Sequence, residues 1–297
     1  MITQNEQRPI VGIFWMLVTG FCFVGVTALV KTLDPAIPAP VSAFMRYVLG
    51  LVFLIPMIKP LFTAGLSRQQ WSFSVMRGVA HSLGVALWFF AMTRIPIADV
   101  TAMNYLVPIY VTVGAALFLG EKLALRRALA VAAGLLGALI IVRPGFRDVG
   151  AGHIAMLGTA LMFGVSYLMA KRLSRDVSPA VVVALLSIFV TIGLAPLALA
   201  NWVTPSNWDL LILFAIAFLA TAGHYTMTMA FAAAPVTVTQ PVTFLQLIWA
   251  VMLGYFVFDE GIDPFVVAGG GVIIAAVSFI TWREAVLKRR VEAPPTN

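Results

Sequence analysis

Ten continuous apolar runs, each about 20 residues long, constrain the fold of this chain more than any other feature. At 1.5 Å per residue, one such helix crosses roughly 30 Å of hydrocarbon. The runs do not alternate between apolar and polar residues, which favours helices over membrane strands. The chain is therefore predicted to be an all-α membrane protein with ten transmembrane helices, at residues 11–30, 38–58, 71–92, 98–118, 125–142, 150–170, 178–200, 209–231, 236–256 and 263–282.

The composition agrees with lipid as the solvent of this chain. Hydrophobic residues make up 61% of it and charged residues 10%, whereas a soluble domain carries roughly 25% charged residues. The net charge of +7 comes from basic residues that lie between the apolar runs, so we interpret them as topology signals and expect no nucleic-acid partner. Cys22 is the only cysteine, which excludes an intrachain disulfide, and we expect no metal or cofactor.

Most Lys and Arg residues fall in one of the two sets of alternate loops. By the positive-inside rule, both termini are predicted to be cytoplasmic, in the plasma membrane of a bacterium (its inner membrane). The tails are residues 1–10 and 283–297, and the polar N-terminal tail predicts no cleavable signal peptide.

An internal repeat relates residues 11–142 to residues 150–282. A shift of 140 aligns Gly12, Met16, Leu17, Thr19, Phe23, Lys31, Leu33 and Pro56 with identical residues, and a shift of 139 does so for Pro96, Leu106, Ile109 and Glu121. Each repeat holds five spans, an odd number, so the second must be inverted relative to the first. Inverted repeats around a central site are typical of alternating-access transporters.

The stretch from residue 91 to residue 145 resembles the EamA-type repeat of the drug/metabolite transporter superfamily. The resemblance rests on a short Pro-containing link, on the sequence Leu-Gly-Glu that ends at Glu121, and on a small-residue span that ends at Arg143. The second half has a weaker copy, in which Asp259 replaces the glycine before Glu260. The resemblance implies that spans 1, 3, 4, 6, 8 and 9 surround a cavity, with spans 5 and 10 outside it. Within the superfamily, the chain looks most like bacterial exporters of amino acids by its general similarity, which implies export of amino acids.

Polar and aromatic residues within the spans are the candidates for lining that cavity, because polar groups facing lipid are costly. They are Trp15, Thr19, His81, Trp88, Asn104, Tyr167, His224, Thr243 and Gln246. For Thr and Ser, a hydrogen bond within the protein is the simpler alternative. Pro108 is predicted to kink its helix at Asn104, as a hinge or as a static bend.

Four charged residues call for separate interpretations. Arg46 and Arg77 lie within spans, where each could hold a substrate carboxylate, but snorkelling to headgroups or bonding to backbone carbonyls is the favoured interpretation. Glu121 and Glu260 end their spans, and we interpret both as structural corners that cap the following helix.

The acidic residues all lie in loops, tails or span ends, so no carboxylate is predicted at mid-membrane. Ion-coupled carriers commonly use one there, and we therefore favour a facilitator over proton coupling through histidine. The predicted function is transport of small polar metabolites, most specifically amino acids, by a monomer or homodimer in the lipid bilayer. The alternatives are a carrier of drug-like or nucleotide-related solutes and an integral-membrane enzyme. No clustered acid, base and nucleophile supports the enzyme.

Overall fold

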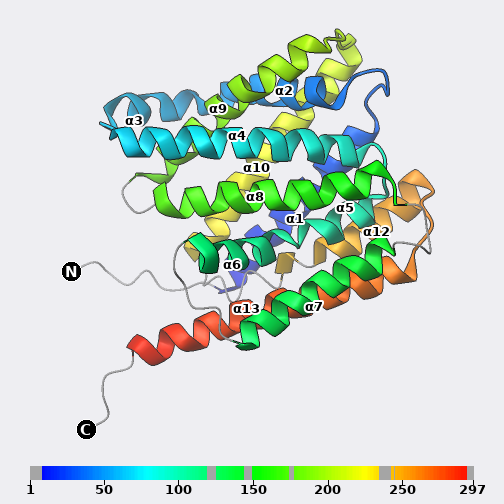
Figure 1. The fold of residues 1–297 in the computed structure, drawn as a ribbon. Coiled ribbons are helices and arrows are strands. Elements are labelled where there is room, and N and C mark those ends of the chain that lie inside the picture. Colours follow the sequence, from blue (N-terminus) through cyan, green and yellow to red (C-terminus); the bar gives the residue numbers. More distant parts are fainter. Residues whose placement is uncertain are drawn as a thin grey trace.

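A computed structural model describes residues 9–118, 125–143, 149–173, 177–233, 242–243 and 245–292, and every regular element in them is a helix (Figure 1). The first half contains α1 (Pro9–Lys31), α2 (Ala39–Gly50), the 3₁₀-helix η1 (Leu51–Met57), α3 (Ile58–Thr63), α4 (Arg68–Met92), α5 (Ile97–Asn104), α6 (Val107–Phe118) and α7 (Leu125–Val142). The second half contains α8 (Ala151–Leu173), α9 (Pro179–Ala200), α10 (Asn207–Ala233), α12 (Leu245–Phe258) and α13 (Pro264–Glu292). The predicted all-helical membrane fold is confirmed.

Five helices are long and apolar enough to cross a membrane unaided: Ile10–Lys31, Arg68–Met92, Ala151–Ala170, Ala180–Ala200 and Asn207–Met227. The apolar stretches of the other described helices are shorter, including Pro264–Ile280 within α13. Two predicted spans are composite, because α2 continues through η1 into α3 and because α5 is followed by α6. Such breaks are tolerated in a membrane where neighbouring helices bury the interrupted backbone.

The break between α5 and α6 lies immediately before Pro108. Proline has no N–H to donate to the Asn104 carbonyl four residues earlier, and its ring crowds that turn. α5 ends in a tight turn in which the Tyr105 N–H donates to the Ala102 carbonyl at 3.2 Å. The helix is therefore interrupted where the sequence predicted a kink. The use of Pro108 as a hinge stays a prediction.

The two halves contact each other through matched pairs of helices. α1 of the first half packs along α10 of the second, and α8, the repeat equivalent of α1, packs along α4 of the first. α2 likewise packs on α9, and α7 on α13 (Figure 1). A helix and its repeat equivalent thus make equivalent contacts in opposite halves, as a duplicated and inverted fold requires.

α7 and α13 lie together at the edge of the bundle (Figure 1). A Cβ atom added to Gly137 would lie 2.7 Å from the Gly269 carbonyl oxygen, and one added to Gly269 would lie 2.5 Å from the Gly137 carbonyl oxygen. The two backbones therefore approach so closely that only glycine fits at either position. Small residues commonly allow such contact between membrane helices.

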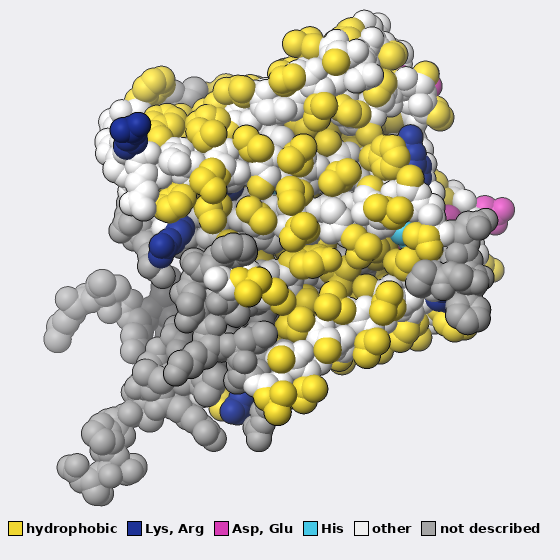
Figure 2. Space-filling model, viewed as in Figure 1, with side chains coloured by type: hydrophobic (Ala, Val, Ile, Leu, Met, Phe, Trp, Pro, Cys, Tyr) yellow, Lys and Arg dark blue, Asp and Glu magenta, His cyan; other side chains and the backbone are white. Residues whose placement is uncertain are grey.

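On the surface, apolar and charged side chains lie at different levels along the helix axes. Figure 2 shows hydrophobic side chains over the middle of this face, basic side chains near both ends, and acidic side chains at the end where α5 and α13 begin. We call this the outer end, after the predicted orientation. The first residue of α1 and the last of α13 lie at the opposite end (Figure 1). The chain is a multi-pass membrane protein.

Candidate functional site

The aromatic face between α4 and α8 brings together three of the predicted cavity residues. His81, on α4, stacks on Phe163 of α8 with ring centroids 4.7 Å apart, and its Nδ1 atom lies 3.1 Å from the Ser166 hydroxyl. Trp88 and Tyr167 also contact Phe163, with centroids 6.3 and 6.4 Å away. We call these five residues the Phe163 cluster.

A glycine makes this cluster possible. A Cβ atom on Gly84 would lie 2.7 Å from the Phe163 ring, so the ring occupies the space that any larger residue would need. The indole N–H of Trp88 is buried and has no hydrogen-bond partner among the described residues. Tyr167 keeps 44% of its surface exposed although it lies beside buried Phe163. The cluster therefore combines ring faces with an unsatisfied donor, a combination suited to a polar aromatic ligand.

A second face forms where α1 meets α10 and α12. The hydroxyls of Thr19 and Thr226 lie 2.9 Å apart and are buried, while the Thr19 hydroxyl also lies 2.9 Å from the Trp15 carbonyl. The His224 ring packs edge-on against Phe23, with centroids 5.2 Å apart. Thr19 thus satisfies its hydroxyl within the protein, as the simpler alternative for threonine predicted.

Three more of the predicted cavity residues, Gln246, Thr243 and Asn104, lie beside α12 or beside the break between α5 and α6. The side chain of Gln246 sits against α1, because a Cβ atom on Gly20 would lie 2.9 Å from its Cγ atom. The Thr243 carbonyl accepts a hydrogen bond of 2.9 Å from the Tyr105 hydroxyl. The side-chain oxygen of Asn104 is buried without a hydrogen-bond partner in the described part of the chain. Thr243 and Asn104 thus both flank the kink.

Arg46 and Arg77 differ from the expectation of snorkelling. Both are buried inside the bundle, with 8% and 7% of their surfaces exposed. The Arg77 Nη1 atom donates to the Val182 carbonyl at 3.0 Å, which is the backbone bond predicted as the other option. The Arg77 bond confirms the backbone-carbonyl form of the favoured interpretation. The burial of both side chains does not fit snorkelling, and it depends on tertiary packing that a single sequence does not reveal.

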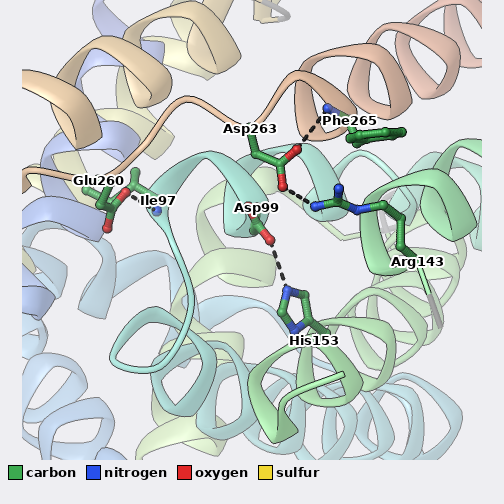
Figure 3. A network of polar contacts seen from close by, with 7 residues as sticks. All are labelled: Ile97, Asp99, Arg143, His153, Glu260, Asp263 and Phe265. Atoms are coloured by element: carbon green, nitrogen blue, oxygen red, sulfur yellow. Dashed lines mark hydrogen bonds and ion pairs between the residues drawn. The ribbon is translucent and has the colours of Figure 1, made fainter. Parts of the chain in front are cut away.

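A polar network ties the helices together at the outer end (Figure 3). Asp99, in the first turn of α5, lies 2.9 Å from the Nε2 atom of His153 in α8, and both side chains are buried. Arg143, after α7, pairs with Asp263 before α13. Each pair joins one half of the chain to the other, so these contacts hold the two halves together at the outer end of the bundle. We call them, together with Glu260 and Lys31, the outer seal.

The contacts of Glu260 differ from the sequence prediction in which helix its carboxylate caps. Its carboxylate caps a helix N-terminus, but the helix is α5 rather than the following α13, because the Ile97 N–H donates to it at 2.9 Å. Its other oxygen pairs with Lys31 at the end of α1. The N-terminus of α13 is capped instead by Asp263, which accepts from the Phe265 N–H at 2.9 Å (Figure 3). Glu121, the repeat equivalent of Glu260, lies outside the described residues.

A cavity of about 160 Å³ lies beneath the outer seal, lined by residues that include Ala98, Val251 and Val266. Sites for drug-sized ligands span roughly 300–1,000 Å³, so this cavity is too small for one. Its lining includes Asp99, Glu260 and Asp263, so it lies at the outer seal and is not the predicted central site.

The chain has clear relatives among known proteins. The riboflavin transporter of Rhizobium johnstonii is 31% identical over 292 residues, which cover 97% of each chain. The S-adenosylmethionine uptake transporter of Rickettsia prowazekii is 24% identical over 82% of each chain. A solved crystal structure matches with a TM-score of 0.57 and 17% identity, covering 92% of this chain and 96% of that one, which supports the fold alone.

These relatives carry different metabolites, and they give no support to the predicted amino-acid substrate. The EamA-like transporter family matches twice, over residues 10–143 and again over residues 150–282, almost the boundaries of the internal repeat. The duplicated family match, the matched helix pairs and the relatives agree with one another. This chain belongs to the EamA-like transporter family and is a membrane transporter of small metabolites, not an enzyme.

Proposed function

We propose that this protein is an alternating-access carrier of a small metabolite with a flat heteroaromatic ring, and that riboflavin is the first substrate to test. The observation that carries this proposal is the Phe163 cluster, in which ring faces from α4 and α8 adjoin the exposed Tyr167. Offset stacking on such rings stabilises a flat ligand by about 0.5–1.5 kcal/mol per ring pair beyond the burial of its apolar area.

The relatives favour the same substrate class. Riboflavin has a flat tricyclic ring and a polar chain, and the Rhizobium johnstonii riboflavin transporter aligns with almost the whole of this protein. Among the standard amino acids, only tryptophan offers a fused ring to the Phe163 cluster. We therefore replace the amino-acid substrate predicted from the sequence with a heteroaromatic one.

The outer seal supports the mechanism. In the described conformation, ion pairs and hydrogen bonds join the two halves at the outer end. A carrier must close one end while substrate enters from the other. We propose that this conformation receives substrate from the end opposite the seal, which is cytoplasmic in the predicted orientation.

Counterflow in proteoliposomes tests the proposed substrate. Vesicles preloaded with unlabelled riboflavin should transiently accumulate labelled riboflavin from outside, while vesicles preloaded with unlabelled amino acids should not. Tyr167→Leu should weaken apparent affinity about tenfold through lost stacking. Tyr255→Leu is the matched control, because Tyr255 lies on α12 with 51% of its surface exposed. Amino-acid exchange without riboflavin exchange would contradict the proposal.

A further inference from the structure

Two arginines lie inside the helix bundle without an acidic partner. Arg46 is on α2 and Arg77 is on α4, and each has less than a tenth of its surface exposed. Within the described residues, no carboxylate lies within ion-pair distance of either guanidinium. The acidic side chains that the structure places in ion pairs are Asp99, Glu260 and Asp263, all at the outer seal.

The hydrogen-bonding capacity of the two arginines is largely unused. A guanidinium has five N–H donors in a planar fork. Arg77 uses its Nη1 atom for the Val182 carbonyl, whereas its Nε atom is buried with no hydrogen-bond partner among the described residues. The Arg46 guanidinium lies over the ring of Tyr47, 4.1 Å from its centroid, and no described residue accepts a hydrogen bond from it.

The two arginines lie on helices that pack together. α2 packs on α4 and on α10, and α4 packs on α8. His81 lies one helical turn from Arg77 on α4 and contacts Phe163 and Ser166 of α8. The α4 helix therefore carries Arg77 next to the Phe163 cluster.

Two side chains on the helices that pack around the arginines are exposed. Tyr167, a member of the Phe163 cluster on α8, keeps 44% of its surface exposed, and His224 on α10 is also exposed.

A guanidinium charge within a membrane is costly unless an anion or polar groups compensate it. We propose that Arg46 and Arg77 bind the anionic group, a phosphate or a carboxylate, of the heteroaromatic metabolite whose ring stacks at the Phe163 cluster. This inference rests on the proposed function and adds to it a preference for ring-containing metabolites that bear a negative charge. The planar sets of N–H donors on the two guanidinium groups match the oxygens of such a group in geometry and in charge.

Two flavins that differ by one phosphate test the proposal. Riboflavin and riboflavin 5′-phosphate share the same ring, so the difference in their affinities isolates the anionic group. Flavin fluorescence on the purified full chain in neutral detergent should show the phosphate form binding at least about tenfold tighter, the gain typical of a charge-assisted hydrogen bond.

Variants then assign that preference to the arginines. Arg46→Gln and Arg77→Gln should each abolish most of it while riboflavin still binds, and Arg46→Lys should retain part of it because the charge remains. Arg94→Gln is the matched control, since Arg94 is exposed at the outer end and lies over Phe90. Equal affinity for the two flavins, or a preference that survives both Gln variants, would overturn the proposal.

A second measurement separates failure of this inference from failure of the proposed function. Inorganic phosphate should raise the unfolding temperature of the parent protein but not that of the double Arg46→Gln, Arg77→Gln variant, whether or not flavins bind. Riboflavin exchange without phosphate preference would leave the function standing and reject the arginine site. If phosphatidylglycerol, but not phosphate, stabilises the protein through these arginines, they bind a lipid headgroup and the proposal is wrong.

Discussion

The carboxylate of Glu260 accepts a hydrogen bond from the Ile97 N–H, 2.9 Å away, and so joins the end of α12 to the start of α5 (Figure 3). The two residues belong to opposite repeats. Gly254 makes room for this contact, because a Cβ atom there would lie 2.5 Å from the Glu260 carboxylate. With the Lys31 ion pair, Glu260 holds three helix ends together at the outer seal.

Neutralising Glu260 should loosen the outer seal. Glu260→Gln keeps an oxygen for the Ile97 N–H but loses the ion pair with Lys31, which is worth about 1 kcal/mol for a partly exposed pair. Outward opening should become about fivefold more frequent. Labelling of Val251→Cys, behind the seal, by an impermeant maleimide in a Cys22→Ser background measures that change.

Asp259→Asn is the control for this substitution, because Asp259 is exposed and has a φ of 53°, a conformation that Asn tolerates. It should leave the labelling rate unchanged. If both variants label at the parent rate, the Lys31–Glu260 contact does not hold the seal.

The close approach of α7 and α13 predicts a sharp difference between two glycines. Gly137→Ala would place a methyl group 2.7 Å from the Gly269 carbonyl oxygen and should cost about 1–3 kcal/mol of stability through overpacking. Gly271→Ala, where a Cβ atom meets nothing within 4 Å, should be neutral or stabilising by up to about 1 kcal/mol. Unfolding midpoints in detergent compare the two, and equal midpoints would argue against the observed helix contact.

Pro108→Ala tests whether the break between α5 and α6 is a hinge. Alanine restores the N–H that the Asn104 carbonyl lacks and should favour a continuous helix. If the break moves during transport, the exchange rate should fall by about tenfold, which corresponds to roughly 1.4 kcal/mol on the barrier, with unchanged substrate affinity. An unaltered rate would make the break a static bend.

Whether a proton gradient drives transport is predicted from the positions of the acidic residues. The ion-paired carboxylates lie at the outer seal rather than at mid-bundle, and His81 and His224 are the titratable candidates that the sequence places near mid-span. We predict a facilitator that runs down the solute gradient. An imposed pH gradient should not drive accumulation in proteoliposomes, and a proton ionophore should not change the rate. Uphill transport that is lost in the double His81→Gln, His224→Gln variant would show proton coupling instead.

The sequence predicted the helices well and their contacts less well. Continuous apolar runs define the spans, and the missing N–H of Pro108 located the break in span 4, because both are local properties of the chain. The Asp99–His153 pair joins residues 54 positions apart, and nothing in either segment signals the other. The helix that Glu260 caps also depends on how the two repeats meet, so the adjacent α13 was the natural but incorrect choice.

Only part of the candidate site was predicted from the sequence, because contacts between distant helices are not local properties of the chain. His81, Trp88 and Tyr167 were expected inside the bundle because polar and aromatic side chains avoid lipid, and they meet at Phe163. The burial of Arg46 and Arg77 depends on which helix faces are covered, and snorkelling is the better guess for an arginine near a span end. The helices that carry them, α2 and α4, pack on α10 and α8 of the other repeat.

The most direct test of the account is to lock the outer seal reversibly. Lys31→Cys and Glu260→Cys in a Cys22→Ser background place two thiols where the ion pair lies, and a short bifunctional reagent with a reducible linker can join them. Riboflavin counterflow should stop in the linked carrier and return after reduction, while the single-cysteine variants treated alike should continue to exchange. Undiminished counterflow with the seal linked would contradict alternating access through this end of the bundle.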